Sequence, residues 1–98
     1  MPEPVSLPEL KAFARVDFDD EDTLIEGLGI AAREYVEQAT GRTYTEGTVS
    51  ERAKVAIKSL ATFWFEHRGD TNAAPPAHVR RLINQLRTWT EPADEVVA

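Results

Sequence analysis

Three consecutive aromatic residues, Phe63-Trp64-Phe65, end a segment whose apolar side chains recur at helical spacing from Ala53 onward. Neighbouring residues on an α-helix are rotated by about 100° around its axis, so these three rings cannot share one face. A helix that is apolar over so much of its circumference is central in its domain or is covered by another subunit. We expect both here, with Phe63 or Phe65 partly at subunit contacts, where aromatic anchors are common. The alternative is that both rings fill the core of their own chain.

Three further segments show helical spacing of apolar residues, and each has local signals for its start or end. Ser6 and Glu9 have the spacing of a capping box, which predicts a first helix over roughly 6–16. The second helix follows the acidic residues 17–22, whose carboxylates we expect to cap it, and it ends at Gly41. Its predicted apolar stripe comprises Leu24, Leu28, Ala31, Ala32, Tyr35, Val36 and Ala39.

The third and fourth helices are bounded by equally simple signals. Thr48 and Glu51 have a second capping-box spacing, so the third helix is expected to start there and to run to about His67. Pro75-Pro76 precedes the fourth helix and Pro92 ends it. The fourth stripe comprises Val79, Leu82, Ile83, Leu86 and Trp89. The predicted fold class is all-α, a small bundle of four helices with short loops and at most a minor extended piece after the second helix.

The chain has 98 residues, no cysteine and a formal net charge of −6. We expect a single helical domain over 1–98, with an ordered core over about 6–90 and a flexible tail over 91–98. Without cysteine it forms no disulfide and no zinc–thiolate site. We expect no signal peptide, and no stretch reaches the roughly 18 apolar residues of a membrane span. The acidic balance argues against sequence-blind DNA binding, which depends on neutralising phosphates.

The sequence carries no recognisable catalytic or metal-binding pattern. A calcium-binding EF-hand loop starting at Asp17 needs glycine at its sixth position and glutamate at its twelfth, where this chain has Asp22 and Leu28. His67 and His78 have no partner at a metal-ligand spacing. No phosphate-binding glycine loop and no nucleophile elbow occurs. We therefore expect a protein that is not an enzyme, with no catalytic residue, no metal and no cofactor.

Charge is distributed unevenly along the chain. Residues 17–26 contain six acidic residues and no basic one, whereas residues 76–90 contain three arginines and no acidic residue. Ordinary surface charge, an arginine row lining a DNA passage, and a contact between the two regions in neighbouring subunits are all consistent with this pattern. Opposite patches on different faces favour a head-to-tail contact, which closes into a ring if the rotation permits. The candidate interface residues are Asp19, Asp20, Asp22, Phe63, Phe65, Arg80, Arg81, Arg87 and Trp89.

Several short motifs follow one another in a familiar order between Leu7 and Trp89. They are Arg15-Val16-Asp17 at the end of the first helix, the acidic cap 19–22, Ala31-Ala32-Arg33-Glu34-Tyr35 followed by Thr40-Gly41-Arg42, and Phe63-Trp64-Phe65-Glu66-His67-Arg68. This order resembles the small head–tail connector (adaptor) family of tailed bacteriophages and gene-transfer particles. Gln85 and Leu86 stand where family members often have Pro-Tyr, so we expect the fourth helix to continue unbroken to Trp89.

The resemblance implies a structural virion protein that assembles as a ring of about twelve subunits beneath the portal protein. Such a ring extends the DNA channel and offers a docking surface to stopper or tail-completion proteins. Double-stranded DNA would pass through its lumen without sequence-specific binding, and the protein would reside at the head–tail junction after assembly in the host cytoplasm.

The alternative is a small helical dimerisation or regulatory module of a bacterial pathway. A helix-turn-helix DNA-binding protein is disfavoured, because the loop 70–76 before the fourth helix is too long and too rich in proline for the required turn.

Overall fold

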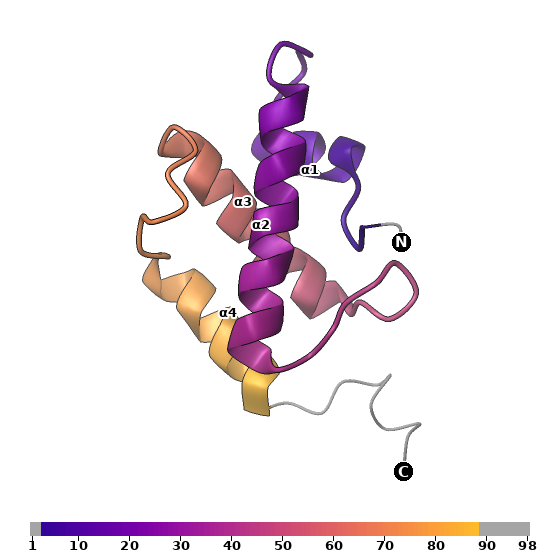
Figure 1. The fold of residues 1–98 in the computed structure, drawn as a ribbon, viewed down its shortest axis with the longest axis vertical. Helices are drawn as coiled ribbons and strands as arrows, with labels where there is room; N and C mark the ends of the chain where they lie inside the picture. Colours follow the sequence, from indigo (N-terminus) through magenta and orange to yellow (C-terminus); the bar gives the residue numbers. More distant parts are fainter. Residues whose placement is uncertain (1–2, 89–98) are drawn as a thin grey trace.

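The computed structural model describes residues 3–88, which fold into four α-helices (Figure 1). These are α1 (Leu7–Ala14), α2 (Asp22–Thr40), α3 (Glu51–Glu66) and α4 (Ala77–Thr88). Residues 3–88 contain no β-strand, so the predicted all-α bundle is confirmed and the extended piece considered after the second helix does not form a strand. Over the same residues, no helix combines the length and apolar character needed to cross a membrane.

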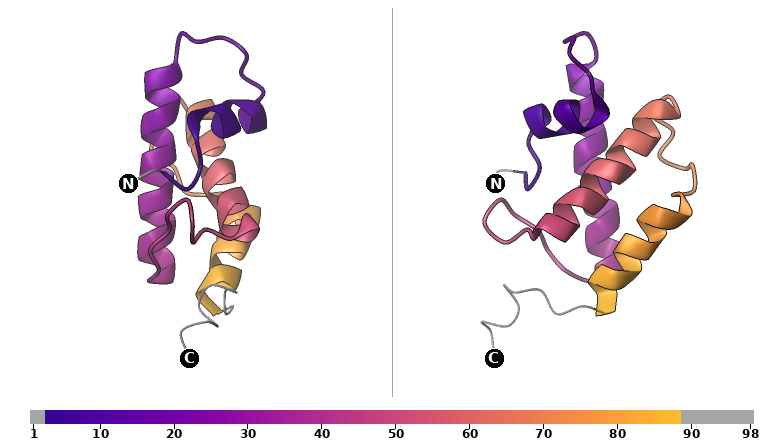
Figure 2. Two further views of the ribbon diagram at one scale, coloured as in Figure 1. Left: turned by 90° about the vertical axis from the view of Figure 1, so that its right-hand side faces the viewer. Right: turned by 180° about the vertical axis from the view of Figure 1, so that it is seen from behind.

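The central helix is α3, as its aromatic run predicted. It packs against all three other helices. In Figure 2, α2 lies on one side of the molecule and α1, α3 and α4 on the other, with α3 and α4 antiparallel. Trp64 is only 2% exposed, and its indole N–H donates to the carbonyl oxygen of Ala73 at 3.2 Å. This bond holds the α3–α4 connection against the core while satisfying the buried indole nitrogen.

The core combines one apolar face from each helix with the segments that connect them. Its members are Val5, Leu10, Val16, Ile25, Leu28, Ala32, Val36, Tyr44, Ala53, Ala56, Ile57, Leu60, Ala61, Trp64, Val79, Ile83 and Leu86. The stripe predicted for the fourth helix is confirmed as far as Leu86. Trp89, the predicted end of that helix at Pro92 and the predicted tail 91–98 lie outside the described residues.

The helix starts only partly follow the prediction. At α1 the capping box is present, because the Ser6 hydroxyl accepts from the N–H of Glu9 and the Glu9 carboxylate accepts from the N–H of Ser6. At α3 the predicted cap is wrong. Ser50, not Thr48, accepts the N–H of Ala53, and the Thr48 hydroxyl instead accepts the N–H of Thr45 within the preceding loop.

The start of α2 also departs from expectation. Its N-cap residue, Glu21, makes no side-chain cap hydrogen bond, so the predicted capping by carboxylate is not seen there. The end of α2 is as predicted. Gly41 has φ 74°, a left-handed conformation that glycine adopts without the steric cost of a Cβ atom.

Two glycines within α2 have different surroundings. A Cβ atom at Gly29 would lie 2.5 Å from a methyl carbon of the buried Leu10, so the absent side chain lets α1 approach α2 closely. A Cβ atom at Gly27 would have no neighbour within 4 Å. Gly29 is therefore explained by packing, whereas no contact in the structure explains Gly27.

The buried face of α2 is rotated from the predicted stripe. Ile25 and Gly29 are buried, whereas Leu24 and Tyr35 are 41% and 40% exposed. The apolar residues of this helix cover more than one face, and the pattern alone does not show which face accepts α1. Close approach at Gly29 selects the face centred on Gly29 and Ala32.

Candidate functional site

The acidic loop, residues 17–22 between α1 and α2, is held by one lysine. Lys11 Nζ lies 2.6 Å from Asp19 Oδ1 and 2.8 Å from Asp22 Oδ1. The hydrogen bond with Lys11 lowers the pKa of Asp19, and the bonds to Asp19 and Asp22 raise the pKa of Lys11. Two of the three aspartates predicted to meet a neighbouring subunit thus already have a partner in their own chain. Asp20 is exposed and makes no ion pair within residues 3–88.

An aromatic ring projects from the same loop. Phe18 is 48% exposed, more than any other large apolar side chain of residues 3–88. Its neighbours along the chain, Asp17 and Asp19, are both exposed. Phe18 is not among the interface residues predicted from the sequence. Its position among acidic residues, away from any helical stripe, is the signal that it does not belong to the core.

The three arginines predicted as a basic face are all exposed on α4. Arg80 and Arg87 are two helical turns apart and border a groove of about 220 Å³ between α2 and α4. This α2–α4 groove is lined by Tyr35, Ala39, Arg80, Ile83, Asn84 and Arg87. Arg81 is rotated by about 100° from Arg80 and does not line the groove. None of the three arginines has an ion pair within residues 3–88.

The two candidate aromatic anchors on α3 both pack against the core of their own chain. Phe65 is half-buried and lines a narrow crevice with Leu10 and Ile25, between α1 and α2. The ring of Phe63 lies against that of His67, with the centroids 4.1 Å apart and the planes tilted by 41°, and it borders an open groove of about 170 Å³. Their packing supports the interpretation that they complete the core of their own chain, and Phe63 also reaches an open surface.

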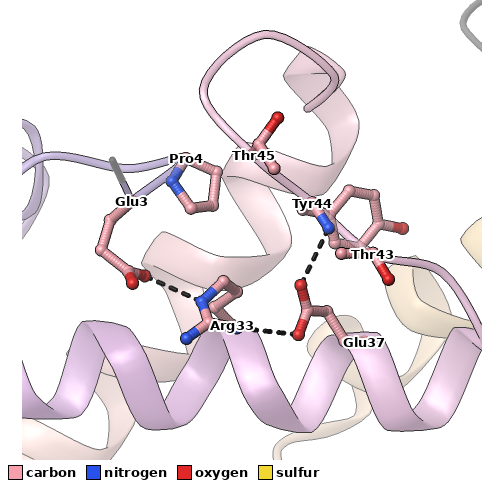
Figure 3. A pocket seen from close by; sticks show the side chains of 7 residues that line it. All are labelled: Glu3, Pro4, Arg33, Glu37, Thr43, Tyr44 and Thr45. Carbon is pink, nitrogen blue, oxygen red and sulfur yellow. Dashed lines mark hydrogen bonds and ion pairs between the residues drawn. The ribbon is translucent and has the colours of Figure 1, made fainter. Parts of the chain in front are cut away.

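A polar brace joins the N-terminal segment, α2 and the α2–α3 loop (Figure 3). Arg33 Nε lies 2.9 Å from a carboxylate oxygen of Glu3, and another Arg33 nitrogen lies 2.8 Å from Glu37. The other oxygen of Glu37 accepts the backbone N–H of Tyr44 at 2.8 Å. The hydrogen bond to Glu3 is the largest cause of the raised pKa of Arg33. The charged groups that line the pocket of about 340 Å³ beside this brace, Glu3, Arg33 and Glu37, pair with one another, so we assign the brace a structural role.

Both motif arginines of the second helix region therefore have internal roles. Arg33, from the Ala-Ala-Arg-x-Tyr motif, holds the N-terminal segment through Glu3. Arg42, from Thr-Gly-Arg, donates from Nε to the carbonyl oxygen of Leu86 at 3.2 Å near the end of α4. Sequence reasoning recognised these motifs but not their contacts, because the partners lie 30 and 44 residues away.

Comparison with known families gives one match of nearly the full described length. The model of the phage gp6-like head-tail connector protein family matches residues 4–88. No curated protein and no solved structure matches the chain. Since the family match covers all four helices and the segments between them, the chain belongs to the phage gp6-like head-tail connector family and has a structural, connecting role in the virion.

Proposed function

We propose that the protein assembles as a ring of about twelve subunits beneath the portal, extends the DNA channel, and presents a docking surface for stopper or tail-completion proteins. Family membership supports the connector role, and one observation on the chain itself supports self-assembly. Surfaces of opposite charge, the acidic loop and α4, lie near opposite ends of the long axis (Figure 1). Such surfaces cannot meet within one subunit, but they can meet head to tail between two.

The subunit contacts that we propose are those of the predicted interface. In these contacts the acidic loop, with Asp19, Asp20 and Asp22, faces the exposed arginines of α4 on the neighbouring subunit, Arg80, Arg81 and Arg87. Trp89, which lies outside the described residues, belongs to the same predicted interface. Of these three aspartates, Asp20 is the one with no ion pair within residues 3–88, so it is the first of them expected to contact the neighbouring subunit. Phe63 contributes to the interface through the part of its ring that borders the open groove, whereas Phe65 packs mainly within its own chain.

The mechanism requires interfaces and a lumen, and no covalent chemistry. A net charge of −6 on each subunit suits a channel through which DNA must pass, because strong attraction to phosphate would slow its exit. DNA would therefore pass without sequence-specific contacts. The protein would be found at the head–tail junction of the virion.

The test is the native mass measured by light scattering during size-exclusion chromatography, over a wide range of concentration. A species near twelve times 10.9 kDa supports the ring. A stable dimer contradicts it and favours the small regulatory module. If the protein is a monomer alone, binding to DNA-filled, tailless heads decides the matter: bound subunits support assembly on the portal, and no binding contradicts the connector function.

A further inference from the structure

We propose that Phe18 of one subunit inserts into the α2–α4 groove of the next, with Asp17 and Asp20 of its loop pairing with Arg80 and Arg87 at the rim of the groove. This inference rests on the proposed self-assembly and specifies the contact that produces it. The occupant of the groove is thus a second copy of this chain.

The acidic loop presents an aromatic ring that its own fold does not cover. Phe18 is about half exposed, and burial of such a ring is a large favourable contribution at an interface. Asp17 and Asp20 on either side of it are exposed and make no ion pair within residues 3–88. The ring and the two carboxylates together form an acidic, aromatic knob.

The knob is held in place before any partner arrives. Val16 is buried immediately before it, and Lys11 binds both Asp19 and Asp22 across it. A loop fixed in this way loses little conformational entropy on binding. The internal ion pairs of Asp19 and Asp22 therefore position Phe18 and need not themselves contact the neighbour.

The groove matches the knob in size and chemistry. Its volume is about 220 Å³, and a cavity of roughly 150 Å³ already binds benzene, so a phenyl ring fits. Ile83 and Ala39 give it apolar walls, and Tyr35, 40% exposed, offers an aromatic surface. Arg80 and Arg87 have no ion pair within residues 3–88, and their guanidinium groups suit carboxylates.

The two halves of the contact belong to opposite ends of α2. The acidic loop leads into Asp22, and the groove begins at Tyr35 and continues past Ala39. With a rise of 1.5 Å per residue, Asp22 and Ala39 lie about 25 Å apart along this helix. The knob therefore cannot reach the groove of its own chain, and its contact with another copy is heterologous, which is the type that builds rings.

The test uses variants that remove one half of the contact at a time. Phe18→Ser/Asp20→Asn removes the knob, and Arg80→Gln/Arg87→Gln alters the groove. Each is expected to lower self-association at least tenfold by light scattering, or to abolish incorporation into tailless heads if the wild type assembles only there. Mixed in equal amounts, the two variants retain one intact contact per pair and are expected to form a one-to-one complex of twice the subunit mass.

Matched controls separate this contact from general charge attraction. Arg15→Gln/Arg68→Gln makes the same charge change on exposed arginines outside the groove and outside α4, and Phe13→Ser removes a ring with 42% exposure outside the loop. Both are expected to assemble like the wild type. Circular dichroism confirms that every variant is folded.

Disulfide trapping tests the same contact when association is weak, because the chain contains no cysteine of its own. The double variant Asp20→Cys/Asn84→Cys is expected to give a ladder of cross-linked oligomers on oxidation, whereas each single variant stops at a dimer. Asp20→Cys/Glu51→Cys, with its second cysteine at the start of α3, is the control that gives no ladder.

The outcomes distinguish the two proposals. If the wild type assembles but the knob and groove variants assemble equally well, or the controls lose as much, the contact proposed here is wrong and the ring stands. Absence of the ladder likewise overturns the contact. If the wild type binds neither itself nor tailless heads, the proposed function itself fails.

Discussion

The two ends of α2 are attached to the rest of the fold by different contacts. At its N-terminal end, α1 packs closely over Gly29, and Lys11 fixes the acidic loop through Asp19 and Asp22. At its C-terminal end, Arg33 and Glu37 hold the adjoining segments, and Arg42 reaches α4. Each end uses some of its charged side chains in internal contacts and leaves others exposed to solvent. The comparison shows that a charged residue can be assigned to an interface only when its contacts within its own chain are known.

The largest effect is expected at the C-terminal end, in the brace. Arg33→Leu removes the partner of Glu3 and leaves the half-buried Glu37 carboxylate without its cation. We expect a loss of about 1–3 kcal/mol in the free energy of unfolding, measured by urea denaturation. Arg80→Leu, on the exposed side of α4, is the control and should change stability by less than about 0.5 kcal/mol. Equal losses in the two variants would show that the brace does not stabilise the fold.

At the N-terminal end, two glycines sharpen the comparison between packing and helix propensity. Gly27→Ala should raise stability by about 0.4–1 kcal/mol, because alanine favours the helix and meets no neighbour there. Gly29→Ala gains the same propensity but displaces the buried Leu10, so its stability should fall below that of Gly27→Ala by about 1 kcal/mol or more. Thermal and urea unfolding of both variants measure the difference. Equal stabilisation would mean that α1 adjusts freely.

An ion pair near the same end gives a pH dependence. The hydrogen bonds from Lys54 and from Ser6 lower the pKa of Glu9 from 4.5 to about 2. Because the folded state lowers this pKa, the contribution is fully present above the unfolded value and is lost as pH falls from about 4.5 to about 2. The side chain of Glu9 is 37% exposed, so solvent screening limits the contribution to about 1 kcal/mol or less.

The comparison of wild type with Glu9→Gln measures this effect. The stability difference between them should be present at pH 6, shrink below pH 4.5 and weaken with added salt. A difference that does not vary with pH would assign the loss to the capping box instead of the ion pair.

The smallest effect on the free energy of unfolding is expected for the exposed arginines of α4, whose substitution should weaken self-association most. Arg87→Leu should alter the free energy of unfolding by less than about 0.5 kcal/mol, since its side chain is exposed and has no ion pair within residues 3–88. The same variant should weaken self-association. A large loss of stability would instead place Arg87 among the residues that hold the fold.

Local signals predicted most of the fold, and contacts across the chain account for the errors. The capping box of α1 and the stop at Gly41 depend on neighbouring residues, and both were predicted correctly. The cap of α3 was assigned to Thr48 because Thr48 and Ser50 both suit a helix start. The hydrogen bonds distinguish them: the Thr48 hydroxyl accepts from Thr45 within the loop, and the Ser50 hydroxyl accepts from Ala53 in the first turn of the helix.

The candidate site was predicted in its charges but not in its geometry. The arginines of α4 and the acidic run are visible in the sequence, but the division of the aspartates depends on Lys11, eight residues before Asp19. Helical periodicity does not predict the exposed Phe18, because this residue lies in a loop between two helical stripes. The groove beside Tyr35 was missed because the predicted stripe turned that ring toward the core.

The continuity of α2 has a consequence for the shape of the assembly. If the knob and the groove lie at its two ends, one uninterrupted helix of 19 residues fixes the angle through which each subunit turns relative to the last. Curvature is then a property of the folded subunit, determined by α2 and by the acidic loop that Lys11 holds at the start of this helix. A small change in the packing angle between α4 and α2 would alter the rotation at every subunit contact. Added over all subunits, this change would convert a closed ring into an open helical assembly.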